Sequence, residues 1–365
     1  MKLFLALLTS FYSIISSSAQ SLQIEKEFNS NYYELNELEI NLTTEKISIS
    51  KNNQNIFIEN LSGKKIFKSS IAENYFLIAN FQFSNEKVDY PVEIKVFDIQ
   101  GNLVFPYKFL APYDLPHPLF QLNDNAILAL FYPLSFKVKL VSRDSIREVE
   151  LIKDIPFEME KASFMEINED FLYVLTSQSA LDITENVSNV KLYKVNLFDL
   201  NVDKRELDYN TPTLLKLVGG SLFASGVKFE NLKPLGKTIK YDLQLNQLAS
   251  NEKIIEKLIP FENRLYAKYF NAIFELEVDL AVSREYQLSG NERILDIAKS
   301  NEKIIVVTNI AEKNNLYCFL PGLSIDFKEP LDIFGVNKIE NLSISGNHLI
   351  IRHDSKSVEI KTNRN

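Results

Sequence analysis

Short runs of apolar, β-favouring residues alternate with short polar turns along most of the chain. In one such unit, the polar residues 168–170 (Asn-Glu-Asp) run directly into the strand-like segment 171–176 (Phe-Leu-Tyr-Val-Leu-Thr). The same turn-then-strand unit begins six more times, at Asn74, Asn125, Gly220, Asn263, Asn301 and Asn347. Helix signals are weak, and runs of this length bounded by turn residues predict β-strands.

The spacing of these units predicts the architecture. Their second apolar residues are Leu77, Leu128, Tyr173, Phe223, Tyr266, Ile305 and Ile350, and consecutive members lie 39 to 51 residues apart. Other strand-like runs fall between them and bring each repeat to about four strands. Periods of roughly 40–50 residues with four short strands are those of propeller blades. A β-sandwich gives no reason for such a recurrence. We therefore predict an all-β fold, a β-propeller of about seven four-stranded blades, with six or eight left open.

The first and last strands bear on how the propeller closes. Phe57 is an eighth, partial match, but it precedes Leu77 by only 20 residues. After Ile350 a single strand-like run remains, at 357–361, so the last blade lacks one strand. We expect the amino-terminal strand to complete it, which would remove an open sheet edge. The favoured segment is 38–42, and the alternative is 22–27.

The first residues form a separate segment. Lys2 is followed by an apolar run from Leu3 to Ile15 and then by small residues up to Ala19, the layout of a secretory signal. The run is shorter than the ~20 residues of a membrane-spanning helix. We expect residues 1–19 to be a signal peptide cleaved near Ala19, and residues 20–365 to be a single propeller domain. The mature protein would be exported to the periplasm, the cell surface or the medium, as a monomer without a transmembrane segment.

Charge and composition exclude some partners and much chemistry. The net charge is −8 with acidic and basic residues interspersed, which disfavours nucleic acid and anionic membranes. His117, His348 and His353 have no metal-binding spacing, so no metal site is expected. The one cysteine, Cys318, lies in an apolar run and is expected to be buried and inert. There is no phosphate-binding glycine loop or nucleophile turn, and no cofactor is expected.

Three pairs of carboxylates lie two residues apart in strand-like runs. The two side chains of such a pair share one face of a strand, as general acid–base chemistry would allow. The pairs are Glu37 with Glu39, Glu148 with Glu150, and Glu275 with Glu277. We expect all three on the solvated faces of strands.

The repeated units resemble the β-propeller superfamily, in the divergent form common among exported bacterial proteins. The resemblance covers nearly the whole chain after residue 19, at the level of pattern. The Gly-His and Trp-Asp pairs of WD repeats, the boxes of sialidases and the regular double glycines of kelch repeats are absent. Family membership of this kind implies partner recognition more often than catalysis, and no specific activity is carried over.

The lengths of the turns indicate which end of the blades functions. Turns between first and second strands are short, whereas four connections between second and third strands are long: 84–90, 177–189, 225–237 and 310–314. In propellers these long connections share a face with the links between blades, including the proline-rich segment 111–118. Long loops on a rigid scaffold usually carry function, whereas the short turns of the opposite face offer little area and no concavity.

We therefore expect a non-enzymatic propeller that binds a protein, peptide or glycan through the loops of one face. The candidate contact residues are Tyr113, Asp114, His117, Asp182, Glu185, Phe229 and Asn231. The alternative is a hydrolase or lyase whose residues converge on the central channel from different blades.

Overall fold

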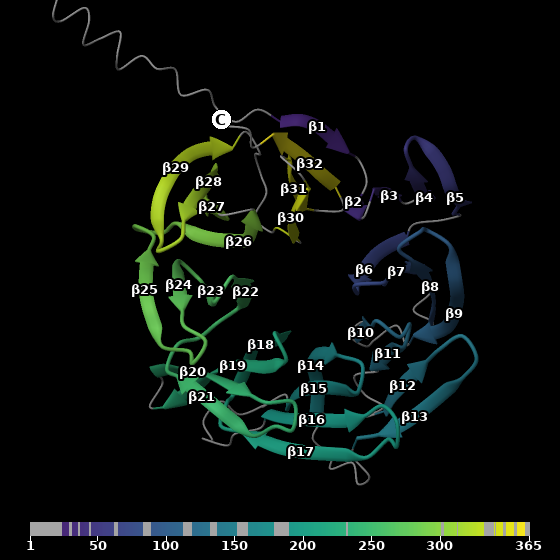
Figure 1. Ribbon diagram of the computed structural model, residues 1–365, viewed down its shortest axis with the longest axis horizontal. Coiled ribbons are helices and arrows are strands. Elements are labelled where there is room, and N and C mark those ends of the chain that lie inside the picture. The colour runs from purple at the N-terminus through teal and green to yellow at the C-terminus, as the bar shows by residue number, and fades with distance from the viewer. Residues whose placement is uncertain are drawn as a thin grey trace, which may run out of the picture. The chain divides into compact units, whose positions relative to one another are not determined.

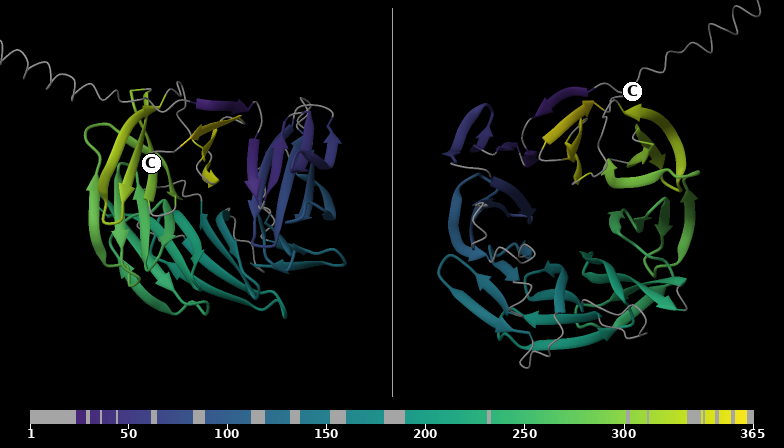
Figure 2. Two further views of the ribbon diagram at one scale, coloured as in Figure 1. Left: turned by 45° about the horizontal axis from the view of Figure 1, so that its top comes forward. Right: turned by 180° about the vertical axis from the view of Figure 1, so that it is seen from behind.

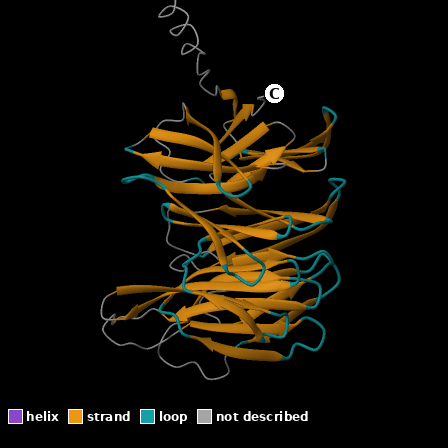
Figure 3. Cartoon of the chain, turned by 60° about the vertical axis from the view of Figure 1, so that its left-hand side comes forward, coloured by secondary structure: helices purple, strands orange, loops and turns teal. Residues whose placement is uncertain are grey.

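The computed structural model describes the chain from residue 24 to residue 361 with gaps. The described residues are 24–28, 31–35, 37–43, 45–61, 65–82, 89–111, 119–131, 137–151, 160–178, 190–230, 233–300, 303–311, 313–331, 339, 341–345, 348–353 and 356–361. The predicted signal peptide, residues 1–19, lies outside them. Strands and loops make up the described chain, without a helix (Figure 3). It follows that this part of the chain contains no helix long and apolar enough to cross a membrane.

The described strands form eight four-stranded sheets, so the protein is an eight-bladed β-propeller (Figure 1). Blade 1 comprises β2 (Asn31–Leu35), β3 (Leu38–Leu42), β4 (Lys46–Lys51) and β5 (Gln54–Asn60). Blade 2 comprises β6 (Lys65–Ile71), β7 (Tyr75–Gln82), β8 (Tyr90–Asp98) and β9 (Leu103–Ala111). Blade 3 comprises β10 (Leu119–Leu122), β11 (Leu128–Phe131), β12 (Lys137–Val141) and β13 (Ile146–Glu150). Blade 4 comprises β14 (Glu160–Ile167), β15 (Phe171–Gln178), β16 (Val190–Asn196) and β17 (Val202–Leu207).

Blade 5 comprises β18 (Thr211–Val218), β19 (Ser221–Glu230), β20 (Lys233–Tyr241) and β21 (Gln247–Asn251). Blade 6 comprises β22 (Lys257–Phe261), β23 (Arg264–Tyr269), β24 (Ala272–Leu276) and β25 (Val282–Gln287). Blade 7 comprises β26 (Arg293–Ser300), β27 (Lys303–Ile310), β28 (Lys313–Leu320) and β29 (Ser324–Leu331). Blade 8 comprises β30 (Asn341–Ser345), β31 (His348–His353), β32 (Lys356–Lys361) and β1 (Ile24–Phe28).

The prediction of a blade completed by an amino-terminal strand is confirmed, but the favoured segment was wrong. β1, in the alternative segment, lies beside β32 and completes blade 8. The favoured segment 38–42 is β3, which pairs with β2 and β4 inside blade 1. The reason is local: Glu37 has a φ of 69° and turns the chain tightly between β2 and β3, so both strands find partners next to them in sequence. The eighth blade is therefore blade 1.

The chain divides into two compact units. The six-blade unit, Phe28–Gln287 with Ser355–Ser357, holds blades 1 to 6, and the two-blade unit, made of Met1–Glu27, Leu288–Asp354 and Val358–Asn365, holds blades 7 and 8. Within the six-blade unit the colours of Figure 2 follow the chain from one blade to the next. The two units are described separately below.

Apolar clusters between successive blades form the core. Leu77 of blade 2 packs with Leu128 of blade 3 in one cluster, and Phe223 of blade 5 packs with Phe274 of blade 6 in another. In the two-blade unit, Val307 and Leu349 join blades 7 and 8 in the same way. Inner strands that neighbouring blades cover on both faces, such as β11 and β27, are continuously apolar rather than alternating. This accounts for the uninterrupted apolar runs of the repeated unit.

Candidate functional site

Each blade has two ends, which we name by their connections. The turn end carries the turns from the first to the second strand and from the third to the fourth. The linker end carries the connections from the second to the third strand and the links between blades. Six of the seven predicted contact residues lie outside the described residues: Tyr113, Asp114, His117, Asp182, Glu185 and Asn231. Phe229 is described, and it lies at the linker end of blade 5.

Phe229 belongs to a β-hairpin where the sequence predicted a long loop. Strands β19 and β20 pair continuously up to Glu230 opposite Lys233, so residues 225–230 and 233–237 continue the sheet and the loop prediction was wrong for them. The outer strand β21 pairs with β20 only from Thr238 onward. The paired residues 226–230 and 233–237, named the arm below, therefore extend past the outer strand of their own blade.

Two glycines at the base of the arm allow the neighbouring inter-blade links to pack closely against it. A Cβ on Gly226 would lie 2.6 Å from a ring carbon of Tyr209, in the link from blade 4. A Cβ on Gly236 would lie 2.4 Å from a side-chain carbon of Ile254 and 2.7 Å from its backbone nitrogen, in the link to blade 6. Real Cβ contacts are never this short, so only glycine allows both links to pack against the arm.

Polar contacts hold the inner strand of the arm. The backbone N–H of Phe229 donates to Asn210 Oδ1 at 2.7 Å, and the Asn210 N–H donates to the Val227 carbonyl at 2.8 Å. Lys228 Nζ lies 3.0 Å from Asp208 Oδ2 and 3.0 Å from Glu230 Oε1. The arm is thus fixed in position before any partner arrives.

The outer part of the arm exposes apolar surface. Phe229 is 37% exposed and Leu235 is 46% exposed. Pro234 lies opposite Phe229 on the neighbouring strand, shares its face and is exposed as well. Leu235 lies opposite Lys228 and therefore projects from the other face of the arm. The sequence reasoning did not single out Leu235, because its position on an extended hairpin follows only from the pairing.

The other predicted long connections give a mixed outcome. Between blade 7 strands β27 and β28, Asn309 pairs with Asn314 and Ile310 pairs with Lys313, so the prediction of a long connection at 310–314 was wrong. The connections 84–90 and 177–189 lie mostly outside the described residues, as does the proline-rich segment 112–118. The described part of the linker end therefore differs from blade to blade.

A second feature of the linker end is an open notch on blade 2, with a volume of about 370 Å³. Asn80, Glu93 and Lys108 lie opposite one another on β7, β8 and β9 and line it. Pro91 and Leu110, also opposite one another, form its apolar rim, and Leu110 is 64% exposed. β9 ends at Ala111, directly before the proline-rich segment that contains Tyr113, Asp114 and His117.

An ion-pair network lies beneath this notch. The buried Lys95 Nζ lies 2.9 Å from Glu93 Oε2 and 2.8 Å from Glu59 Oε2 of blade 1. Glu93 also accepts from Lys108 at 3.0 Å and from Asn80 Nδ2 at 3.3 Å. Burial opposes ionisation of Glu93, but the hydrogen bonds from Lys95 and Lys108, the charge of Lys95 and the Asn80 amide outweigh it and lower its pKa to about 2. Glu93 is therefore a permanent anion at the notch.

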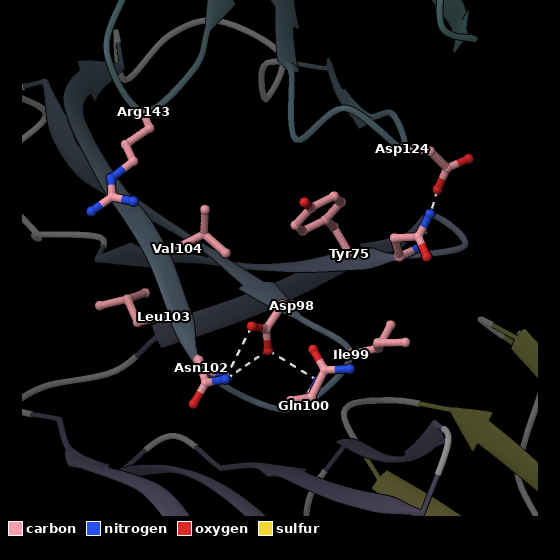
Figure 4. A pocket seen from close by; sticks show the side chains of 10 residues that line it. Tyr75, Asp98, Ile99, Gln100, Asn102, Leu103, Val104, Asp124 and Arg143 are labelled. Carbon is pink, nitrogen blue, oxygen red and sulfur yellow. Dashed lines mark hydrogen bonds between the residues drawn. The ribbon is translucent and has the colours of Figure 1, made fainter.

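The turn end contains a cavity where none was expected. It has a volume of about 520 Å³, lies between blades 2 and 3, and is lined by Tyr75, Asp98, Gln100, Asp124 and Arg143 among others (Figure 4). The expectation that short turns offer no concavity was therefore wrong, because the turns of adjacent blades leave space between them. Asp124 closes part of it by accepting from the Asn74 N–H at 3.0 Å.

The turns themselves repeat one device. Asp98 Oδ1 accepts from the backbone N–H groups of Gln100 and Asn102, both at 2.9 Å, and its Oδ2 accepts from Asn102 Nδ2 at 3.0 Å. Asp242 makes the same three contacts with Gln244 and Asn246, each at 2.8 Å. These are Asx turns, in which a side chain substitutes for a backbone acceptor.

Side chains of one blade also donate hydrogen bonds to the turns at the turn end of the next blade. Asn123 Nδ2 of blade 3 donates to the Asn168 carbonyl of blade 4 at 2.9 Å. Arg205 of blade 4 donates to the Leu245 carbonyl of blade 5 at 2.5 Å, and Asn251 of blade 5 donates to the Leu280 carbonyl of blade 6 at 2.9 Å. These hydrogen bonds, named the mesh below, join blades 3 to 6 in series.

Of the carboxylate pairs expected on solvated faces, one behaves differently. Glu37 and Glu148 are exposed and form ion pairs with Lys51 and Lys139. Glu275, however, is fully buried on β24, where it accepts from the Tyr266 hydroxyl at 2.9 Å and pairs with Arg264. The expectation was wrong for Glu275, because β24 is the third strand of its blade and is covered on both faces.

The two-blade unit holds a similar buried carboxylate. Glu292, in the link into blade 7, accepts from Thr308 Oγ1 at 2.6 Å, from Tyr317 Oη at 2.8 Å and from Asn315 Nδ2 at 3.2 Å. Lys328 Nζ lies 3.5 Å away. Four donors around one carboxylate fix the link onto the face of the blade.

The buried cysteine follows the sequence expectation. Cys318 is buried on β28, and burial raises the pKa of its thiol to about 11, so it is protonated and inert at neutral pH. Within the described ranges, no group of three or more His, Cys, Asp or Glu residues could hold a metal ion.

Comparison with known proteins supports the fold. No protein-family model matches the chain, and no curated protein matches it. Among solved structures, the dihydro-heme d1 dehydrogenase NirN in complex with DHE has a TM-score of 0.57 at 9% identity, over 88% of this chain and 69% of that one. KlHsv2 with its loop 6CD replaced by a Gly-Ser linker has a TM-score of 0.52 at 12% identity, over 80% and 90% of the two chains.

Apo AztD from Citrobacter koseri has a TM-score of 0.52 at 11% identity, over 87% of this chain and 89% of that one. The three names describe different kinds of protein, and sequence identities this low show a shared fold only. The chain is an eight-bladed β-propeller that resembles several distant propellers.

Proposed function

We propose that this protein is an exported, non-enzymatic β-propeller that binds a protein or peptide partner at its linker end. The observation that carries the proposal is the arm of blade 5, a pre-ordered hairpin that exposes Phe229 and Leu235 beyond its own sheet. The residues Tyr113, Asp114, His117, Asp182, Glu185 and Asn231 belong to the same proposed face. The export rests on the pattern of residues 1–19.

The physical reason concerns the cost of binding. Ordering a loop on association costs free energy, whereas a segment already held in place presents its surface without that cost. The Gly226 and Gly236 contacts and the Asn210 hydrogen bonds hold the arm in this way. Exposed aromatic and aliphatic side chains supply the contact area that protein interfaces concentrate at their centres. A glycan would instead require an array of polar groups, and the arm's apolar side chains favour a protein.

The test compares two variants of blade 5 as baits. In the arm variant, Phe229→Ser and Leu235→Ser are combined. In the control, Leu248→Ser changes a residue of β21 that is 56% exposed but lies on the outer strand, away from the arm. Wild type and both variants are immobilised, and proteins retained from an extract of the source organism are identified, purified and titrated by calorimetry.

The proposal expects one purified protein to bind wild type and the Leu248 variant equally and the arm variant at least tenfold more weakly. Equal melting temperatures show that all three baits are folded. A partner that binds the arm variant as tightly as wild type, or one lost through the Leu248 change, overturns the assignment of the arm.

A further inference from the structure

The notch at the linker end of blade 2 combines an apolar rim with a fixed anion. Glu93 lies at its base, and Pro91 and Leu110 lie at its rim. Its volume of about 370 Å³ falls at the lower end of small-ligand sites. A long side chain with an aliphatic stem and a cationic tip has the matching chemistry, since such side chains pack their stems on apolar surface and place the charge beyond it.

The charges around Glu93 identify which group a ligand can replace. Lys95 lies between Glu59 and Glu93, so a single buried cation faces two carboxylates. Lys108 supplies the second cation. Only 16% of the Glu93 side chain is exposed, whereas 73% of the Lys108 side chain is. Moving the Lys108 ammonium group from Glu93 into solvent therefore costs little free energy, and the Glu93 carboxylate remains at the base of the notch.

We propose that this notch is a receptor for one basic side chain of the protein partner, which replaces Lys108 beside Glu93. This inference rests on the proposed function, because it names the chemistry of the same partner. The net charge of −8 attracts a basic partner over distance. Arginine is preferred over lysine, because its planar guanidinium can donate two hydrogen bonds to one carboxylate while also reaching the Asn80 amide oxygen.

The test uses single residues as probes, so it does not depend on the partner being known. N-acetyl-arginine amide, N-acetyl-lysine amide and the uncharged isostere N-acetyl-citrulline amide are titrated into deuterated, ¹⁵N-labelled protein. The side-chain amide of Asn80 and the backbone amide of Leu110 are followed by NMR. We expect saturable shifts with the arginine probe at a Kd on the order of millimolar, weaker binding of the lysine probe, and no saturation with citrulline.

Two variants and a matched control sharpen the result. Lys108→Met removes the internal competitor and should tighten arginine binding about two- to fivefold, the factor that corresponds to an exposed ion pair. Glu93→Gln should abolish it. Lys139→Met removes a similar cross-strand pair with Glu148 on blade 3 and should leave binding unchanged.

Equal shifts with arginine and citrulline, or unchanged binding in the Lys108 variant, overturn the inference. Because Lys108 is exposed, that variant folds even if Glu93→Gln does not. If the probes bind as expected and the arm variant still captures its partner, the receptor stands and the arm assignment fails. If the arm variant loses its partner and the probes do not bind wild type, the arm assignment stands and the receptor proposal fails.

Discussion

The two ends of the six-blade unit are built in different ways. At the turn end, Asx turns such as those of Asp98 and Asp242 recur. Hydrogen bonds from Asn123, Arg205 and Asn251 to turns of the following blade join blades 3 to 6 in series. At the linker end, each described feature occurs once: an arm on blade 5 and a notch on blade 2. Repetition serves the contacts that every blade needs, and features without a counterpart in other blades are the ones to examine for recognition.

The largest expected effect of a single substitution is at the turn end. Asn123 is buried, and its side chain accepts from the Asn125 and Ile127 N–H groups and donates to Asn168 of the next blade. Asn123→Ala should lower the free energy of unfolding by about 2–3 kcal/mol, because three hydrogen bonds at roughly 1 kcal/mol each are lost. Urea denaturation measures it. Asn123→Asp keeps the two acceptor contacts and should recover part of the lost free energy of unfolding. A loss below ~0.5 kcal/mol in the Asn123→Ala variant, which is the scale of neutral surface changes, would contradict the mesh.

A glycine pair tests whether the base of the arm is equally rigid. Gly236→Ala should cost about 1–3 kcal/mol, because the added methyl group overlaps Ile254 and its backbone. Gly219→Ala at the turn end meets no atom within 4 Å, and its cost of about 1 kcal/mol comes only from the left-handed φ of 54°. The thermal midpoints of the two variants, measured side by side, give the ranking. If Gly219→Ala proves the more harmful, the arm is not clamped by its neighbouring links.

The notch predicts a dependence on pH. The pKa of Glu93 is lowered to about 2 in the folded protein from an ordinary value of 4.5. A lowered pKa contributes stability above the unfolded value, and this contribution is lost as the pH falls from about 4.5 towards 2. Wild type should therefore exceed Glu93→Gln in stability by about 1 kcal/mol at pH 7, with the difference shrinking at pH 3. Denaturation at pH 7, 5 and 3 measures the change, and a constant difference would argue against the ion-pair network.

The smallest effect on folding is expected where the effect on binding is greatest. Phe229→Ser with Leu235→Ser should lower the free energy of unfolding by no more than about 1 kcal/mol, because both residues are partly exposed and lie on a hairpin beyond the core of the blade. A loss several times larger would mean that these residues pack within blade 5, and the arm would then resemble the turn end in serving stability.

The turn-then-strand pattern predicted the fold well because every repeated unit occupies one place in a blade. The seven units at Asn74, Asn125, Asn168, Gly220, Asn263, Asn301 and Asn347 lead into or begin the second strands of blades 2 to 8. Second strands are covered on both faces, so their apolar runs are uninterrupted, and the sequence alone contains this signal.

Blade 1 was not counted from the repeat because its second strand lacks an uninterrupted apolar run. Its second strand, β3, alternates buried and half-buried residues, so Glu39 and Asn41 interrupt the apolar run. In the sequence, the polar pair Asn-Glu at positions 36 and 37 precedes it and is the signal that would have identified it. The partial match at Phe57 lies instead in β5, the fourth strand of the blade.

The candidate site was only partly within reach of the sequence. Phe229, which the sequence predicted to lie in a loop, is a partly exposed residue of strand β19 at the linker end. The notch depends on Glu93 facing Lys108 across two strands and on Lys95 reaching Glu59 of another blade. Such pairs have no fixed sequence spacing, because the lengths of the intervening turns set which residues meet.

The position of β1 beside β32 has a consequence for the time course of folding. In the other blades each strand pairs with its neighbour in sequence, so a hairpin can form as soon as its residues have left the ribosome or crossed a membrane. β1 is made early, while its partner is made after seven complete blades. Blade 8 is thus the last to be completed, and its rate is set by the encounter of distant chain segments rather than by any local turn. Until then, the edge strand of the last blade is open to other chains, and this interval is when the protein is most exposed to misassembly.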